Sequence, residues 1–293
     1  MKITVFTPTY NRAYIIERCY LSLKKQSFHD FEWLVIDDGS TDETKELFEN
    51  WIKEQNHFTI RYYWFENCGK QREINRALQL AKGELFFTVD SDDLLTNDAL
   101  EKINAWDQEI PKGEKFCGFA GSDGDMDGNP TNPIFKERNI DVTFCNRYKE
   151  SGLFIGHDRP WVFYTEIHKK YLYPEFANEK FISEAVVWNR MAKDGYKIRC
   201  YNDVIYLIEH QDVGLTNHIQ SILKNNPNGY GLWISEMMDL LNYDFKNRFI
   251  RYYSFFCEMQ DKYSLKEIAK FISAPFYEMI LIYIIYNIKH RRK

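Results

Sequence analysis

The stretch Phe86-Phe87-Thr88-Val89-Asp90-Ser91-Asp92-Asp93 places three carboxylates directly after an apolar segment. Its first four residues are aromatic or β-branched, which is typical of a buried strand. Ligands of open α/β sheets bind at the carboxyl ends of such strands. Three crowded acids repel one another unless a cation lies between them, and their oxygens suit Mg²⁺ or Mn²⁺, which usually hold a substrate diphosphate. The other interpretation is a solvated acidic turn before a helix that begins near Asn97.

Outward from this stretch, residues 2–105 alternate short apolar segments with amphipathic helical patterns, which indicates a mainly parallel sheet flanked by helices. Asn11 is expected to cap the first helix, and Ser40 with Glu43 has the pattern of a capping box before the second. The third helix is expected to end at Gly83. Strands are predicted before the acidic stretch at residues 3–6, 33–36 and 60–65.

The regular alternation ends after residue 110. Gly, Asp, Asn and Pro concentrate at residues 121–133, which predicts a long surface loop or hairpin. A further helix is expected over residues 184–192, ended by Gly195. From about Ile219 the chain has helical patterns rich in aromatic residues.

The composition restricts the class of protein. A chain of 293 residues, 44% of them hydrophobic, can bury a full core, and the net charge of −5 argues against a general nucleic-acid binder. The six cysteines form no CxxC pair, so we expect reduced, buried thiols in a cytoplasmic protein. Met1-Lys2 leads directly into a predicted strand, and no signal peptide is expected.

Two more loops follow predicted strands as the acidic stretch does: Thr7-Pro8-Thr9-Tyr10-Asn11-Arg12 and Asp37-Asp38-Gly39-Ser40-Thr41-Asp42. Neighbouring parallel strands would bring all three loops to one rim of the sheet. In order and spacing, the three loops strongly resemble the nucleotide-sugar-binding half of family 2 glycosyltransferases with the GT-A fold. The resemblance covers most of residues 1–215.

This resemblance implies an α/β fold of the nucleotide-diphospho-sugar transferase (GT-A) type, with a mainly parallel central sheet flanked by helices. Residues 1–215 would form the catalytic domain, with a nucleotide-sugar-binding half at 1–105 and an acceptor half at 106–215. Residues 216–293 would form a helical C-terminal region.

The resemblance also implies a uracil pocket. The Thr7-Pro8 backbone and the Tyr10 side chain would form one wall, where an aromatic face can stack on a base. Asp38 would accept a hydrogen bond from the uracil imide N–H. From the residues alone, Tyr10 could also be a core aromatic, and Asp38 could also form the turn before Gly39.

Positively charged residues follow the third predicted strand, in Asn67-Cys68-Gly69-Lys70-Gln71-Arg72, which resembles the family segment that contacts nucleobase and diphosphate. Lys70 and Arg72 open a helix, whose first N–H groups already favour anions. A solvated surface pair is the alternative.

In the acidic stretch, the resemblance assigns Asp90 to the ribose or the transferred sugar. Asp92 would bind the metal ion, Mn²⁺ or Mg²⁺, that bridges the diphosphate, and Asp93 would be a second ligand or a supporting group. The metal would neutralise charge on the nucleoside diphosphate that leaves.

An inverting transfer needs a base to take the proton of the acceptor hydroxyl. Glu184 is the candidate, because Phe181-Ile182-Ser183-Glu184-Ala185-Val186-Val187-Trp188 resembles the base-bearing segment of the family. That segment usually carries Glu-Asp where this chain has Ser183-Glu184. A structural acid in the first turn of a helix is the alternative.

Three residues are candidates on the acceptor side. Asp158 would bind an acceptor hydroxyl or pair with Arg159, and both interpretations stay open. His210 and Asp212 lie where relatives carry a loop that closes over the diphosphate, and a surface turn is the alternative there.

The segment from Phe276 to Ile288 is nearly all apolar or aromatic, and Lys289-His290-Arg291-Arg292-Lys293 follows it. A helix of this length extends about 20 Å at ~1.5 Å per residue, too short for a hydrocarbon core of roughly 30 Å. Two interpretations stay open. The helix lies in the membrane interface with its basic end on anionic lipids, or it packs on the core with a solvated tail.

Together with these features, the resemblance implies a cytoplasmic, metal-dependent, inverting hexosyltransferase, peripheral at the inner face of the plasma membrane if the tail binds lipid. It would move a hexose or N-acetylhexosamine from a UDP-sugar to a glycan or lipid-linked saccharide in bacterial surface-polysaccharide synthesis, such as that of capsule, without a nucleic-acid partner. A nucleotidyltransferase is a rival, although such enzymes usually carry a Gly-rich loop where this chain has residues 7–12. A catalytically inactive sugar-nucleotide-binding scaffold is another, against which the intact Asp90, Asp92 and Glu184 argue.

Overall fold

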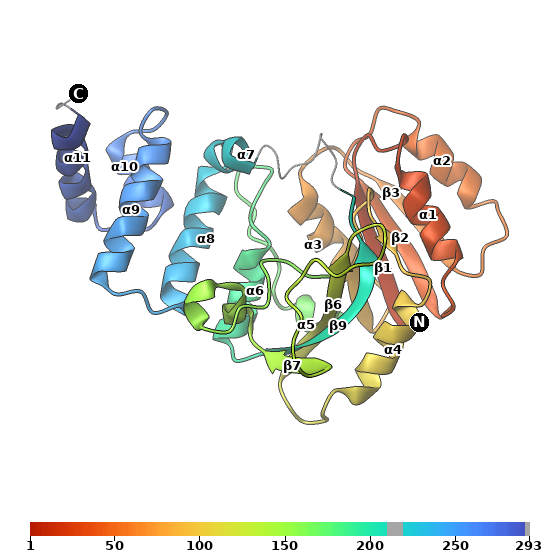
Figure 1. Ribbon diagram of the computed structural model, residues 1–293. Helices are drawn as coiled ribbons and strands as arrows, with labels where there is room; N and C mark the ends of the chain where they lie inside the picture. Colours follow the sequence, from red (N-terminus) through yellow and green to blue (C-terminus); the bar gives the residue numbers. More distant parts are fainter. Residues whose placement is uncertain (210–218, 291–293) are drawn as a thin grey trace. The chain divides into compact units, whose positions relative to one another are not determined.

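The computed structural model describes residues 1–209 and 219–290 (Figure 1). The chain separates into two compact units, Met1–Leu172 with Asp194–Gln211 and Tyr173–Lys193 with Asp212–Lys293. The domain boundary predicted between residues 215 and 216 lies outside the described residues. The strands are β1 (Ile3–Thr9), β2 (Phe31–Asp37), β3 (Thr59–Trp64), β4 (Leu85–Thr88), β5 (Leu94–Leu95), β6 (Phe116–Gly124), β7 (Asn139–Val142), β8 (Trp161–Tyr164) and β9 (Lys197–Leu207).

The α-helices of the described residues are α1 (Ile16–Lys24), α2 (Thr44–Trp51), α3 (Lys70–Leu80), α4 (Ala99–Glu109), α5 (Thr165–His168), α6 (Ala185–Lys193), α7 (Ile219–Asn225), α8 (Pro227–Leu240), α9 (Phe245–Met259), α10 (Leu265–Phe271) and α11 (Phe276–His290). Two short 3₁₀ helices, η1 (Phe144–Arg147) and η2 (Lys149–Ser151), lie between β7 and β8.

The first unit is built on one mixed sheet with the strand order β3-β2-β1-β4-β8-β6-β9-β5, and β7 pairs with β9. Strands β3, β2, β1 and β4 are parallel neighbours. Strand β8 runs antiparallel to β4 and β6, whereas β6 and β9 are parallel. The parallel strands predicted up to the acidic stretch are therefore confirmed, within a mixed sheet, and the loops after β1, β2, β3 and β4 emerge at the same rim.

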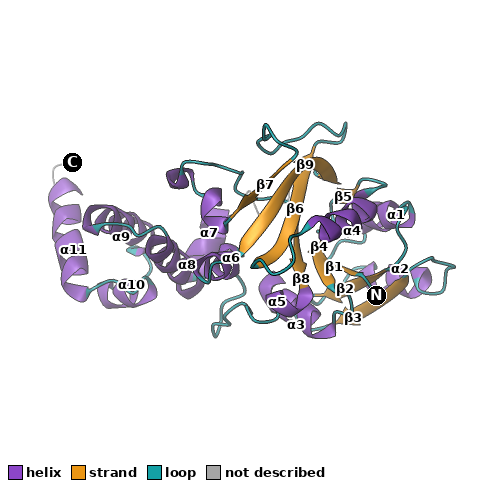
Figure 2. Cartoon of the chain, turned by 90° about the horizontal axis from the view of Figure 1, so that it is seen from below, coloured by secondary structure: helices purple, strands orange, loops and turns teal. Residues whose placement is uncertain are grey.

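Helices cover both faces of this sheet (Figures 1 and 2). Buried side chains of α1, α2 and α4 form one hydrophobic cluster with residues of the sheet such as Ile3, Val5 and Trp33. Helices α3 and α5 lie against the opposite face, where Phe86 contacts Phe6 and the ring of His168. Strands buried on both faces explain why β2 and β4 are apolar without strict alternation.

Three predicted helix ends are wrong. Asn11 has φ +51° and lies outside α1, whose N-cap is Ile15. Ser40 does not cap α2, which begins after Glu43 without a side-chain cap. The C-cap of α3 is Ala81, and Gly83 instead marks a close approach of two strands, because a Cβ there would lie 2.2 Å from the backbone nitrogen of Thr4.

The predicted loop at residues 121–133 is partly a strand. Its first four residues end the buried strand β6, and the chain then turns so that Gly124 pairs with Pro130 in an antiparallel bridge. The predicted surface hairpin is thus confined to its tip. The six cysteines are free thiols, and Cys19, Cys117 and Cys200 are buried.

In the described part of the second unit the regular elements are helices, α6 through α11 (Figure 2). Polar contacts join the segment before α6 to the start of α8. The buried carboxylate of Glu179 accepts hydrogen bonds from the backbone N–H groups of Asn228 (2.8 Å) and Gly229 (2.9 Å). These contacts explain why residues 173–193 belong with the C-terminal helices. None of the helices in residues 1–209 and 219–290 is long and apolar enough to span a membrane.

Candidate active site

The loops after β1 and β2 are joined by hydrogen bonds at the rim of the sheet. The backbone N–H of Asn11 donates to Ser40 Oγ (2.8 Å), and the N–H of Thr41 donates to Asn11 Oδ1 (2.8 Å). The N–H of Ala13 donates to Asp42 Oδ2 (3.0 Å). The side chains that were expected to cap helices therefore hold the two loops together.

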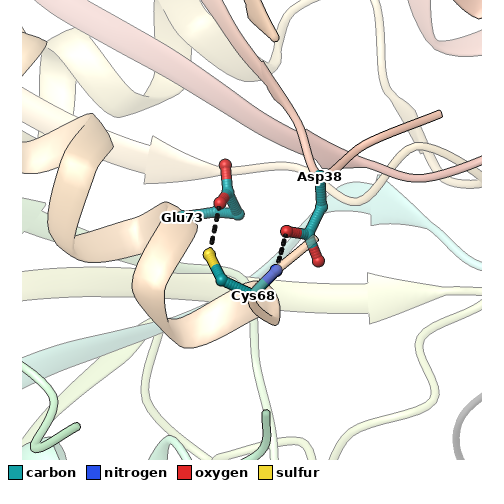
Figure 3. Close-up of side chains that lie close together, drawn as sticks. All are labelled: Asp38, Cys68 and Glu73. Carbon is teal, nitrogen blue, oxygen red and sulfur yellow. Dashed lines mark hydrogen bonds between the residues drawn. The ribbon is translucent and has the colours of Figure 1, made fainter. Parts of the chain in front are cut away.

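Asp38 joins the loop after β2 to the loop after β3 (Figure 3). Its Oδ1 accepts from the backbone N–H of Cys68 (2.6 Å), and its Oδ2 accepts from the N–H of Gly69 (2.9 Å) and from Asn67 Nδ2 (3.1 Å). The side chain of Asp38 thus joins two loops, whereas the local turn contact is made by Asp37, whose Oδ1 accepts from the N–H of Ser40 (2.7 Å). The uracil role stays a prediction.

Cys68 lies between Asp38 and a buried acid, Glu73 (Figure 3). Glu73 Oε1 accepts from the Cys68 thiol (3.1 Å) and from Arg76 Nη1 (2.7 Å). Burial, with the charge of nearby Asp38, raises the pKa of Glu73 to about 7, and burial raises the pKa of Cys68 to about 12. Ligand atoms of Asp38, Cys68 and Glu73 lie within 4.8 Å of one another, yet Arg76 already supplies positive charge there.

The acids after β4 make three different contacts. Lys70 Nζ lies 2.9 Å from Asp90 Oδ1, and Arg12 Nη2 lies 3.7 Å from Asp92 Oδ2. Asp93 Oδ2 accepts from the Tyr206 hydroxyl at 2.9 Å. Burial and the carboxylates of Asp90 and Asp92 raise the pKa of Asp93 to about 8.

The donor atoms of these acids suit a divalent cation, although they do not form a group of three ligand atoms within 4.8 Å of one another in this structure. Burial raises the pKa of Asp93, and the nearby carboxylates of Asp90 and Asp92 raise it further, so negative charge is concentrated there, and the donors are all oxygen. Hard oxygen donors suit Mg²⁺ and Mn²⁺ rather than softer ions. The stretch does form a turn, in which the N–H of Asp93 donates to the carbonyl of Asp90 (3.2 Å). It is not simply a solvated turn, because Ser91 is buried and each acid contacts a residue from another element.

The other donor-side candidates lie at the same rim. Tyr10 is 50% exposed, so the core-aromatic interpretation is wrong. Thr7 is buried, and its Oγ1 accepts from Trp33 Nε1 (2.9 Å) while its backbone continues to the partly exposed Pro8. Arg72 Nη1 donates to the carbonyl of Cys68 (2.7 Å), whereas Lys70 contacts Asp90 and Arg12 contacts Asp92.

On the acceptor side, Asp158 does not form an ion pair with Arg159. Asp158 Oδ1 accepts from the backbone N–H of Arg159 (2.9 Å) and from Trp161 Nε1 (2.8 Å). The buried Arg159 guanidinium instead donates to backbone carbonyls, including those of Gly121 and Pro133. His210 and Asp212 lie outside the described residues.

Glu184 belongs to the second unit and lies immediately before α6. Its carbonyl accepts from the N–H of Val187 (3.1 Å), which opens the helix, and its side chain is half-buried. The catalytic role of Glu184 stays a prediction.

Sequence reasoning assigned no role to Arg12 or Tyr206. Arg12 lies in the loop after the first strand, which was predicted to lie at the same rim as the acidic stretch. The positive charge of Arg12 was therefore a signal that it could contact an acid such as Asp92. Tyr206 is 113 positions from Asp93, and no local pattern indicates that they meet.

A family model for glycosyl transferase family 2 matches residues 4–172, and the chain belongs to this family. One relative is a GalNAc(5)-diNAcBac-PP-undecaprenol β-1,3-glucosyltransferase of Campylobacter jejuni, 29% identical over 66% of this chain and 60% of that protein. Another is TarS of Staphylococcus aureus, a poly(ribitol-phosphate) β-N-acetylglucosaminyltransferase, 34% identical over 50% of this chain and 25% of TarS. The chain thus spans less than two thirds of either relative.

Solved structures confirm the predicted GT-A fold. Residues 1–349 of S. aureus TarS in complex with UDP-GlcNAc match with a TM-score of 0.62 and 18% identity, over 93% of this chain and 84% of that one. The mannosyltransferase PcManGT of Pyrobaculum calidifontis, in complex with GDP-Man and Mn²⁺, matches with a TM-score of 0.56 and 20% identity, over 81% of this chain and 64% of that one.

Proposed function

We propose that the chain is a metal-dependent, inverting hexosyltransferase that moves a hexose or N-acetylhexosamine from a UDP-sugar to a lipid-linked saccharide in bacterial surface-polysaccharide synthesis. The observation that carries the proposal is the convergence at one rim of Tyr10, Asp38 and the acids Asp90, Asp92 and Asp93. The undecaprenol-linked acceptor in the name of the Campylobacter relative supports the acceptor class. The TarS complex with UDP-GlcNAc supports the donor.

On the donor side, residues of this chain would bind the UDP-sugar and hold it in position. Tyr10 presents an exposed ring on which uracil can stack, and Asp38 is held in place by N–H groups of the next loop. Asp92 and Asp93 would hold Mn²⁺ or Mg²⁺, and Asp90 would contact the sugar. When bound, the cation supplies positive charge for the departing diphosphate.

At the acceptor, Glu184 would take the proton of the attacking hydroxyl. The oxygen bonds to the anomeric carbon from the face opposite UDP, the bond from that carbon to the diphosphate breaks, and UDP leaves. Asp158 would bind an acceptor hydroxyl, and His210 and Asp212 would act from the position at which relatives carry a loop that closes over the diphosphate.

The exposed face of α11 supports contact with an anionic membrane surface. Large apolar or aromatic side chains stay exposed along the helix, while its one acid, Glu278, is buried. The helix leads into the basic sequence at residues 289–293, so the apolar stripe and positive charge complement a bilayer with anionic lipids. The exposed apolar residues are Phe276, Tyr277, Ile280, Leu281, Tyr283, Ile284 and Ile288.

The test incubates the purified chain with UDP- and GDP-linked hexoses and N-acetylhexosamines in Mn²⁺ and measures release of the nucleoside diphosphate. We expect release of UDP that EDTA abolishes. Asp92→Asn in Mn²⁺ should behave like wild type in EDTA, whereas the exposed Asp127→Asn should match wild type. Undiminished turnover in EDTA would contradict the metal assignment, and no release from any UDP-sugar would favour the inactive scaffold.

A further inference from the structure

Tyr206 connects the far half of the sheet to the acidic loop. Its hydroxyl accepts from the backbone N–H of Asp90 at 2.8 Å and donates to Asp93 Oδ2 at 2.9 Å. A phenol can do both at once, since it carries one donor and has lone pairs to accept. One buried oxygen therefore holds the first and last acids of the loop.

The position of the hydroxyl is itself restrained. Tyr206 is in β9, where its backbone pairs with Leu95 and Leu207 pairs with Leu94. Its ring meets Phe87 edge to face, with centroids 6.2 Å apart. Phe87, before the acids, and Leu95, after them, thus both contact Tyr206.

The acidic loop needs such a restraint. Three carboxylates within four residues repel one another, and each can rotate about its side-chain bonds. Lys70 and Arg12 contact Asp90 and Asp92, and for Asp93 the hydrogen-bond donor in the described residues is Tyr206. Removal of a group that orients a metal ligand commonly weakens metal binding by about 10–100-fold.

We propose that Tyr206 is a positioning residue for the cation site of Asp92 and Asp93. It holds the Asp90 backbone and the Asp93 carboxylate in the arrangement that a divalent cation requires. This inference rests on the proposed metal-dependent function and goes beyond it, because it assigns a role to a strand outside the nucleotide-binding half.

The test compares Tyr206→Phe with Tyr201→Phe, a matched control in the same strand whose hydroxyl donates to Glu109 Oε2 (3.1 Å). Mn²⁺ binding to the protein without nucleotide is measured by electron paramagnetic resonance. Tyr206→Phe should weaken Mn²⁺ binding by about tenfold, and Tyr201→Phe should leave it unchanged. UDP affinity in EDTA should be the same in both variants and wild type, since a general loss of structure would lower it.

Hydrogen exchange gives a second measurement that does not need the variant to fold. In wild type, Mn²⁺ should slow exchange both at residues 90–95 and at residues 204–207, because Tyr206 joins them. Protection confined to 90–95, or equal Mn²⁺ affinity in Tyr206→Phe and wild type, overturns this inference alone. A wild-type protein that binds no Mn²⁺ overturns the proposed metal site together with it.

Discussion

At the scale of single residues, Lys70 and Arg12 already balance part of the negative charge of the acidic loop. The side chains of the Lys70–Asp90 pair are 24% and 39% exposed, and those of Arg12–Asp92 are 19% and 20% exposed. Solvent-accessible ion pairs contribute only about 0–1 kcal/mol. Both cations can therefore exchange a carboxylate for a phosphate oxygen at little cost.

Asp38→Ala should weaken UDP binding by about tenfold, because one hydrogen bond to a charged acceptor is lost. The structure adds a second effect, because Asp38 also accepts hydrogen bonds from the N–H groups of Cys68 and Gly69. The variant should therefore lose thermal stability as well. Isothermal titration with UDP and GDP measures the first effect, and thermal unfolding measures the second.

The control for this prediction is Asp42→Ala, which also removes a contact between two rim loops. Asp42→Ala should lower stability without changing the preference for UDP over GDP. If Asp38→Ala weakens UDP and GDP equally, Asp38 acts only through the loop and not through uracil.

Glu184→Gln should lower kcat by about 10²–10⁴-fold, because the amide keeps the shape of the acid but cannot take a proton. Donor affinity should barely change, because the base acts on the acceptor. Steady-state kinetics and UDP-sugar titration together measure this difference.

Glu166→Gln is the matched control, since it makes the same change in an acid whose side chain is 82% exposed. A structural Glu184 would show a lower melting temperature with a normal rate per folded molecule. Near-normal turnover by a well-folded Glu184→Gln protein would redirect the search for the base to Asp158, Asp203 or Asp212.

At the scale of elements, the short helix α5 places an unusual group in the core. His168 is buried between the rings of Phe86 and Phe163, and neither ring nitrogen has a hydrogen-bond partner in the described residues. Burial lowers the pKa of His168 to about 3. The folded state thus holds this histidine neutral, although an unfolded histidine titrates near ~6.5.

Acid should therefore destabilise the fold through His168. Above pH ~6.5 the ring is neutral in both states, and as pH falls toward the folded pKa the unfolded state binds the proton first. At pH 5 this amounts to about 2 kcal/mol of lost stability. His168→Leu removes this acid-dependent loss of stability. In urea unfolding, the free energy of unfolding of the variant relative to wild type should therefore be higher at pH 5 than at pH 7.5.

His157→Leu serves as the comparison, because His157 is exposed. It should follow the pH dependence of wild type. A His168→Leu protein with the same acid sensitivity as wild type would show that other groups account for it.

At the scale of the whole molecule, the proposed membrane contact through the exposed face of α11 can be tested directly. Leu281→Asp with Ile284→Asp should reduce binding to vesicles with anionic lipids by at least about tenfold, because two apolar side chains no longer enter the interface. Flotation with phosphatidylglycerol vesicles measures the bound fraction. Folding should be unaffected, since these side chains are 46% and 47% exposed while Met279 and Ile282 provide the packing.

Ile134→Asp, in the first unit and 56% exposed, is the control for adding an acid to an apolar surface position. Equal flotation of wild type and the α11 variant would exclude this face as the membrane contact. A wild-type dimer that becomes a monomer in the α11 variant would instead assign the face to a second copy.

The sequence alone determined the parallel strands and the rim at which their loops meet. Both depend on local periodicity and on a general rule of sheet topology, so residues such as Ile3 and Trp33 could be placed in the core, and Asp38 and Asp92 at one edge, without coordinates. Cys19 and Leu23 lie four positions apart in the sequence, and both are buried on α1.

Only the tertiary structure decided where the polar side chains of that rim bond. Asn11 and Ser40 are residue types that often cap helices. In this structure their side chains instead make hydrogen bonds between two loops, to residues 29 and 30 positions away in the sequence. Tyr206 reaches Asp90 across 116 positions. A hydrogen bond needs two groups within about 3 Å, and for groups far apart in the chain that distance is set by how the strands pack, which no local pattern of residues encodes.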